Sequence, residues 1–198
     1  MIVSAVVLAG GRSSRFGRDK LAEPIDGEPV LSRTIAAVLG VATDIVVVTG
    51  PDATVEVPSG VRIARDPSAY GGPLVGILAG LAVARHEAVL VVGGDMPWLR
   101  PDVLALMLDA LVPGKGAVAL EDEGRLQQLP IALRRDAGLE AARGLLDAGE
   151  RRLGALLEAL SVATIAEGAW RALDPDAATL RDVDTPGDLP QADGQRQG

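Results

Sequence analysis

The chain has 198 residues, and 19 Lys and Arg against 27 Asp and Glu give it a formal net charge of −8. Apolar residues make up 48% of the sequence, which is enough for one sizeable core and excludes an intrinsically disordered chain. The absence of Cys and the presence of a single His exclude disulfides, thiolate zinc sites, a cysteine nucleophile and multi-histidine metal sites.

The first 115 residues show alternating strand and helix patterns. The run over residues 2–9 is apolar and β-branched throughout, which is typical of a central strand in a covered parallel sheet. A loop rich in Gly and Arg follows it. Further strands are predicted over residues 45–48, 61–64 and 88–92, and helices over 29–39, 73–84 and 101–111. The alternation predicts an α/β sheet with helices on both faces.

The second part of the chain is less regular. Strands are predicted over residues 117–120 and 129–133, helices over 138–146 and 152–160, and a short late strand over 180–184. We find no linker between domains, so a single domain is expected over residues 1–190. Residues 191–198 have little apolar surface to bury and are expected to form a flexible tail.

The loop over residues 10–20 carries the densest chemistry in the chain. Its three glycines let backbone N–H groups converge on an anion. Its four cations, Arg12, Arg15, Arg18 and Lys20, repel one another unless an anion balances them. The loop follows the first strand, at the edge where open α/β sheets bind ligands. It matches neither a Walker A loop nor a dinucleotide fingerprint, so a nucleotide phosphate site is one interpretation and a solvated basic turn is the other.

Two aspartates follow other strands at the same predicted edge. Asp95 comes directly after the fourth strand, where a hard carboxylate beside phosphates suits Mg²⁺. Its alternative role is to cap the helix that starts near Pro101. Asp66 follows the third strand, and its alternative role is that of a turn residue before Pro67.

Asp182 and Asp184 form a second acidic pair near the end of the chain. Alternation in the strand predicted there places both side chains on one face, so either could be a further Mg²⁺ ligand beside Asp95. Asp184 could equally cap a short helix at Pro186.

Several blocks of the sequence resemble those of the molybdenum cofactor guanylyltransferases and their nucleotidyltransferase relatives. The blocks are Leu8-Ala9-Gly10-Gly11-x-Ser13-x-Arg15-Phe16-Gly17-x-Asp19-Lys20, Gly72-Pro73-Leu74-x-Gly76-Ile77, Asp95-Met96-Pro97-x-Leu99, Gly149-Glu150-Arg151-Arg152 and Asp182-Val183-Asp184-Thr185-Pro186. They occur in the family's order and span nearly the whole chain. The resemblance implies a Rossmann-like three-layer nucleotidyltransferase fold with a mostly parallel sheet, a nucleotide-binding half over residues 1–115 and an acceptor-binding half over 116–190.

The resemblance also implies an activity: Mg²⁺-dependent transfer of GMP from GTP to the phosphate of molybdopterin, with release of pyrophosphate. It implies that Arg15, Lys20 and Asp95 are catalytic. It implies a nucleotide site formed by Leu8, Ala9, Gly10, Gly11, Lys20, Asp66 and Asp95. For the metal it implies Asp95; the alternation noted above makes Asp184 the expected second ligand. From their positions in the second half of the chain, the expected acceptor-binding residues are Arg125, Arg151 and Arg152, with a solvent-facing arginine as the alternative interpretation of each.

Alternatives remain open at the level of the substrate. Asp182 and Asp184 stand where many guanylyltransferases have Asn, and Asp there is similar to the related cytidylyltransferases, so CTP is an alternative donor. Another phosphorylated acceptor, or a non-catalytic module that delivers cofactor, are further alternatives.

The same sequence features set expectations for partners and location. The acidic balance and four aromatic residues argue against nucleic acid, and no apolar run reaches the roughly 18 residues of a membrane span. We expect a cytoplasmic monomer or weak homo-oligomer, with molybdoenzyme apoproteins or other cofactor-biosynthesis proteins as possible partners.

Overall fold

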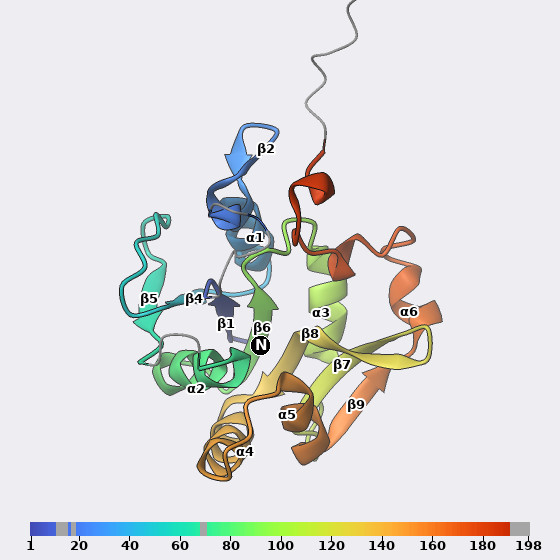
Figure 1. Ribbon diagram of the computed structural model, residues 1–198. Helices are drawn as coiled ribbons and strands as arrows, with labels where there is room; N and C mark the ends of the chain where they lie inside the picture. The colour runs from blue at the N-terminus through green and yellow to red at the C-terminus, as the bar shows by residue number, and fades with distance from the viewer. Residues whose placement is uncertain (11–15, 17–18, 68–70, 191–198) are drawn as a thin grey trace, which may run out of the picture.

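The computed structural model describes residues 1–10, 16, 19–67 and 71–190, and its centre is a seven-stranded sheet (Figure 1). The strand order is β5-β4-β1-β6-β8-β7-β9. The strands are β1 (Val3–Leu8), β4 (Asp44–Thr49), β5 (Arg62–Arg65), β6 (Ala88–Gly93), β7 (Ala117–Asp122), β8 (Arg125–Arg134) and β9 (Val162–Ile165). All neighbours pair in parallel except β8, which runs antiparallel to both β6 and β7. The prediction of a mostly parallel sheet is therefore confirmed.

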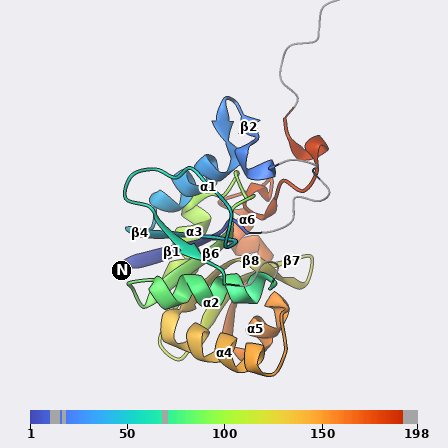
Figure 2. The same cartoon turned by 60° about the vertical axis from the view of Figure 1, so that its left-hand side comes forward.

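Helices cover both faces of the sheet, as Figure 2 shows: α1, α3 and α6 lie on one side and α2, α4 and α5 on the other. The helices are α1 (Val30–Leu39), α2 (Pro73–Val83), α3 (Pro101–Asp109), α4 (Arg135–Asp147), α5 (Leu153–Ala159) and α6 (Glu167–Arg171). A small hairpin of β2 (Pro24–Ile25) and β3 (Glu28–Pro29) and three 3₁₀ turns, η1 (Lys20–Ala22), η2 (Ala178–Leu180) and η3 (Pro186–Asp188), complete the elements. Three layers result, as predicted.

The central strands are apolar throughout because their side chains point alternately to two faces of the sheet that are both covered by helices. In β1, Val7 packs into the core cluster on the α1 and α3 side, whereas Val6 packs into the cluster under α2 and α4. Successive side chains of a strand point to opposite faces, so a strand that is covered twice needs apolar residues at every position. The seven strands and helices predicted in the first 115 residues are confirmed to within two residues at each end.

The strand predicted over residues 180–184 is wrong. The chain there passes from η2 into a segment without regular structure, and Val183 N donates a backbone hydrogen bond to Asp95 O at 2.9 Å. The segment follows the turn after β6 instead of lying beside a strand, so a ladder does not form. A pattern of alternating polar and apolar residues does not by itself specify a neighbouring strand to pair with.

Other elements were not predicted from the sequence. They are the β2–β3 hairpin, strand β9 and helix α6. Each is short, and β9 depends on pairing with β7, whose residues lie more than 40 positions earlier in the chain. The predicted tail over residues 191–198 lies outside the described residues. In the described part of the chain, no helix combines the length and the apolar character that crossing a membrane requires.

Gly80 allows α2 to approach the sheet closely. A Cβ at this position would overlap Val6 Cγ1 and lie 3.0 Å from Val48 Cγ2. Both contacts are with buried side chains of neighbouring strands, which have little room to move.

We therefore expect Gly80→Ala to lower the free energy of unfolding by about 1–3 kcal/mol, the usual cost of overpacking a core. Urea unfolding measures this change. Gly144→Ala in α4 is the matched control, because a Cβ at Gly144 meets nothing within 4 Å. The control should gain up to about 1 kcal/mol from helix propensity. Equal effects of the two substitutions would contradict the packing argument.

Candidate active site

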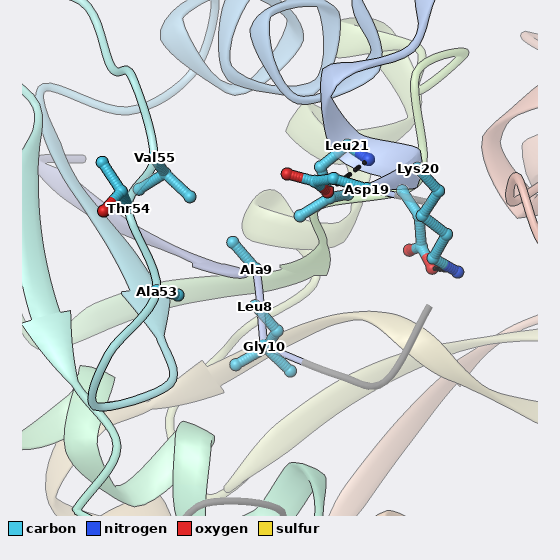
Figure 3. Close-up of a pocket in the computed structure, with 10 residues that line it drawn as sticks. Leu8, Ala9, Gly10, Asp19, Lys20, Leu21, Ala53, Thr54 and Val55 are labelled. Atoms are coloured by element: carbon cyan, nitrogen blue, oxygen red, sulfur yellow. Dashed lines mark hydrogen bonds and ion pairs between the residues drawn. The ribbon is translucent and has the colours of Figure 1, made fainter. Parts of the chain in front are cut away.

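A cleft of about 280 Å³ opens at the carboxyl ends of β1 and β6 (Figure 3). Its lining residues come from the end of β1 and the connection that follows it, from the loop after β4 and from the turn after β6: Leu8, Ala9, Gly10, Asp19, Lys20, Leu21, Ala53, Thr54, Val55 and Asp95. Carboxyl ends of parallel strands are where open α/β sheets bind their ligands, and the predicted edge is the one that carries the cleft.

Backbone contacts fix the floor of the cleft. Gly94 N donates to Leu8 O at 2.9 Å, which ties the turn after β6 to the end of β1, and Ala9 N donates to Val48 O of β4 at 2.8 Å. A Cβ at Gly94 would lie 3.1 Å from Leu8 O and 3.4 Å from the Cα of Ala9. A glycine is therefore needed for this close approach, which places Asp95 at the mouth of the cleft.

Lys20 lies between two carboxylates at the charged end of the cleft. Its Nζ is 2.7 Å from Asp95 Oδ2 and 3.1 Å from Asp184 Oδ1, and 18% of its side chain is exposed. Burial on its own lowers the pKa of Lys20, but the hydrogen bonds and charges of Asp95 and Asp184 outweigh it and raise the pKa above its ordinary value. The ammonium is thus fully charged at neutral pH. The structure brings together Lys20, Asp95 and Asp184, which the sequence assigned to one site.

Asp19 stabilises the turn on which Lys20 lies. Its Oδ1 accepts a hydrogen bond from Leu21 N at 3.1 Å and caps the short turn η1, on which Lys20 is the first residue.

Asp182 adds a third carboxylate to this end of the cleft. One carboxylate oxygen from each of Asp95, Asp182 and Asp184 lies within 4.8 Å of the other two. Partial burial, followed by the negative charges of Asp184 and Asp95, raises the pKa of Asp182. Three hard oxygen donors at this spacing fit a divalent cation such as Mg²⁺, which takes carboxylate oxygens and completes its shell with water and phosphate.

Val183 anchors the segment that carries Asp182 and Asp184 to the core. It is fully buried in a small apolar cluster with Phe16, Ile25 and Val30, and its N–H donates to Asp95 O. Phe16 belongs to the loop after β1 and Ile25 to the β2–β3 hairpin. The cluster therefore ties the hairpin, the loop after β1 and the C-terminal segment together beneath the charged end of the cleft.

Two capping roles considered for the aspartates are wrong. Thr185 is the N-cap residue of η3, where its side chain and backbone N–H bond to Asp188, so Asp184 does not cap this turn. Arg100 is the N-cap residue of α3, so Asp95 does not cap that helix. In both cases the chain continues past the aspartate before the helical turn begins, which leaves the carboxylate at the cleft.

The predicted acceptor residues fall in two places. Arg151 and Arg152 lie in the turn between α4 and α5. There Glu150 accepts hydrogen bonds from the Arg152 side chain, at 2.7 Å, and from both arginine backbone amides, and these bonds lower the pKa of Glu150 to about 2. The carbonyl of Arg151 also lies against Gly72 at the start of α2. Arg125 instead begins β8 in the hairpin with β7, so the structure does not place it on the same turn.

Other predicted residues do not line the cleft or lie outside the described part of the chain. Asp66 follows β5 and its N–H donates to Thr49 O at 2.8 Å, but Asp66 is not among the residues that line the cleft. Arg15 and Gly11 lie outside the described residues. Sequence reasoning missed the wall over residues 53–55, because that loop carries no motif and reaches the cleft through the pairing of β4 with β1.

Comparisons with known proteins show the family of this chain. A family model described as a MobA-like NTP transferase domain matches residues 5–164. A probable molybdenum cofactor guanylyltransferase from Chloroflexus aggregans is 33% identical over 96% of this chain and 92% of its own length. A molybdenum cofactor guanylyltransferase from Desulfosudis oleivorans is 30% identical over 96% and 94%.

Solved structures share the fold. Molybdopterin-guanine dinucleotide biosynthesis protein A from Archaeoglobus fulgidus superimposes with a TM-score of 0.74 at 23% identity, covering 94% of both chains. A 2-C-methyl-D-erythritol 4-phosphate cytidylyltransferase from Thermus thermophilus gives a TM-score of 0.70 at 20% identity, covering 96% of both chains. At these identities the likeness concerns the fold alone.

The crowding of carboxylates predicts a pH-dependent stability change. Because the pKa of Asp182 is raised in the fold above its ordinary 3.8, the wild type loses stability as pH rises from 3.8 through the folded pKa. Asp182→Asn should therefore raise the free energy of unfolding at neutral pH in metal-free buffer, and the gain should vanish below pH 3.8. Urea unfolding over a pH series measures it.

Asp188→Asn is the matched control with the opposite sign. Hydrogen bonds from Thr185 and from Asp184 N lower the pKa of Asp188, so its charged form stabilises the fold above 3.8 and this stability is lost as pH falls through the folded pKa. That variant should be less stable than wild type at neutral pH. A stability loss in both variants would contradict the repulsion assigned to Asp182.

Proposed function

Because this chain belongs to the MobA-like NTP transferase family, we propose that it transfers GMP from GTP to the terminal phosphate of molybdopterin and releases pyrophosphate. The observation that carries the proposal is the convergence of Lys20, Asp95 and Asp184 at one end of the cleft. It occurs in a chain that matches proteins named guanylyltransferases over almost its full length.

The reaction needs no nucleophile from the protein. An oxygen of the acceptor phosphate, already anionic, forms a bond to the α-phosphorus of GTP, and the bond from that phosphorus to the bridging oxygen of pyrophosphate breaks. The protein's task is then to position two polyanions and to offset their repulsion. A chain with no Cys and one His suits this chemistry.

The charged end of the cleft supplies this stabilisation. Asp95, with Asp184 and Asp182 beside it, would hold Mg²⁺, which neutralises phosphate charge and polarises the reacting phosphoryl group. Lys20, with its raised pKa, keeps a positive charge beside these carboxylates and donates hydrogen bonds to the phosphates and to the charge that develops on the leaving pyrophosphate.

The rest of the cleft suits the nucleoside. The backbone of residues 8–10, continued by Gly11, seats the guanine and ribose, and Arg15 joins Lys20 on the triphosphate. Asp66 helps to position the nucleotide from the rim. In the half of the chain over residues 116–190, Arg151 and Arg152 receive the acceptor phosphate beside the start of α2, with Arg125 as a further contact. A cytoplasmic location belongs to the same proposal.

A pyrophosphate-release assay tests the proposal. The purified protein, molybdopterin and Mg²⁺ are incubated with GTP, CTP, ATP or UTP in turn. CTP is the informative competitor, because Asp182 and Asp184 resemble the residues of related cytidylyltransferases. We expect release with GTP and loss of release when Mg²⁺ is chelated. Release with CTP but not with GTP, or no release with any of the four nucleotides, would contradict the proposal.

Asp95→Asn should lower turnover far more than it weakens nucleotide binding. The substitution keeps the shape of the side chain but removes the charge that holds the cation, and the cation acts mainly on the reacting phosphates. Steady-state kinetics and GTP titration measure the two effects. Asp109→Asn, a carboxylate at the end of α3, is the control that should leave both unchanged. Wild-type turnover for Asp95→Asn at saturating Mg²⁺ would remove Asp95 from the metal site.

Lys20→Ala should reduce turnover on the order of 10²-fold, which is typical of losing one positioned transition-state donor. Lys115→Ala is the matched control, because Lys115 precedes β7 at the opposite edge of the sheet. A loss smaller than about threefold for Lys20→Ala, or an equal loss for the control, would show that Lys20 does not act on the reacting phosphates.

A further inference from the structure

We propose that Arg65 is a positioning residue that sets the selectivity of the cleft for the nucleotide base. It does so by holding the loop over residues 50–55 in place as the wall of the cleft opposite the charged end. The inference rests on the proposed function, since it assumes that a nucleotide occupies the cleft.

Arg65 is the last residue of β5 and bonds across to the loop that follows β4. Its Nη1 donates to Thr49 Oγ1 at 3.0 Å and to Gly50 O at 3.1 Å, and it also donates to Ala53 O. One guanidinium therefore connects the start of the loop with the residue at which the loop reaches the cleft. The backbone of the loop adds the bond from Ala53 N to Gly50 O at 3.3 Å. The loop lies outside any helix or strand, and it is held by the packing of Val55 against the core and by these bonds from Arg65.

The cleft has a charged end and an uncharged end, which indicates where the base lies. Figure 3 shows Lys20 on one side of the opening and Ala53, Thr54 and Val55 on the other. Phosphates and a cation belong with Lys20 and the carboxylates, so the base of the same nucleotide extends toward residues 53–55. The small apolar side chains of Ala53 and Val55 suit the face of a base, and backbone groups of the loop can form hydrogen bonds with its edge.

A shift of the loop changes the width of the cleft directly. A Cβ at Gly10 would lie 3.7 Å from Gly50 N, an ordinary van der Waals distance, so the start of the loop lies beside the floor of the cleft. Thr49 is fully buried, and its hydroxyl accepts the hydrogen bond from Arg65. Discrimination between bases depends on hydrogen-bonding groups held at fixed positions, because an analogue that leaves a buried polar group unpaired is rejected.

The test compares Arg65→Met and Arg65→Lys with the wild type in the intact protein. Calorimetric titration with GTP and with CTP gives the ratio of the two dissociation constants. We expect Arg65→Met to reduce the preference for GTP by about tenfold, the effect of losing a charge-assisted hydrogen bond. Turnover at saturating GTP should change by less than about threefold, because Lys20 and Asp95 are untouched. The KM for GTP should rise instead. The preference of Arg65→Lys for GTP should lie between those of the wild type and Arg65→Met, because an ammonium can donate to these oxygens but lacks the planar donor geometry of a guanidinium.

Two further variants separate a local effect from a general loss of stability. Arg135→Met is the matched control: its guanidinium also donates to a backbone carbonyl, Leu81 O at 3.0 Å, but at the opposite edge of the sheet, and the GTP preference should stay as in wild type. Thr49→Val removes one acceptor of Arg65 with little change in shape and should lower the preference for GTP in the same direction as Arg65→Met.

The outcomes distinguish this inference from the proposed function. A wild type that prefers GTP, together with an Arg65→Met variant that keeps the full preference, overturns the role of Arg65 and leaves the function intact. An equal fall in Arg65→Met and Arg135→Met also overturns it. A wild type that binds neither GTP nor CTP overturns the proposed function itself.

Discussion

The position of Lys20 between Asp95 and Asp184 is the interaction on which the site depends. The three residues come from the turn η1, the end of β6 and the C-terminal segment, and Lys20 is 75 and 164 positions away from its two partners. Asp95, Asp182 and Asp184 would repel one another strongly without a cation among them. Lys20 offsets part of this repulsion; partial burial and then the remaining charges of Asp184 and Asp95 raise the pKa of Asp182. That remaining negative charge is what favours a divalent cation at this place.

Packing beneath the charges makes the arrangement possible. Val183 is fully buried between the two exposed ends of the acidic segment, and Gly94 lets the turn after β6 pass close to Leu8 O. The apolar cluster of Phe16, Ile25, Val30 and Val183 joins the loop after β1 to the C-terminal segment. A substitution in this cluster would therefore disturb the carboxylates without touching the cleft. At the other end of the cleft, Val55 packs against the core and Arg65 donates hydrogen bonds to the residues at the start of the loop over 50–55.

Much of the fold and part of the site could be predicted from local patterns. The runs that became β1, β4 and β6 are apolar at every position because helices cover them on both faces, and this signal is strong in sequence. Asp95 was assigned to the sheet edge because it follows such a run directly. The interval from residue 180 to 184 misled the same reasoning: its alternation resembles a strand, yet Asp182 and Asp184 meet Asp95 because Val183 is anchored below them.

By itself, then, the sequence determined the layered α/β architecture, the end of the sheet at which the cleft lies, the family resemblance and the placement of Lys20 and Asp95 at one site. Only the tertiary structure decided which carboxylates stand beside Asp95, that Thr185 and Arg100 are the caps, and that the loop over residues 50–55 forms a wall of the cleft. The reason is physical: periodicity and turn chemistry act between neighbours in the chain, whereas these contacts join residues far apart in sequence. Their distances are fixed by the order of the strands and by packing at the end of the sheet.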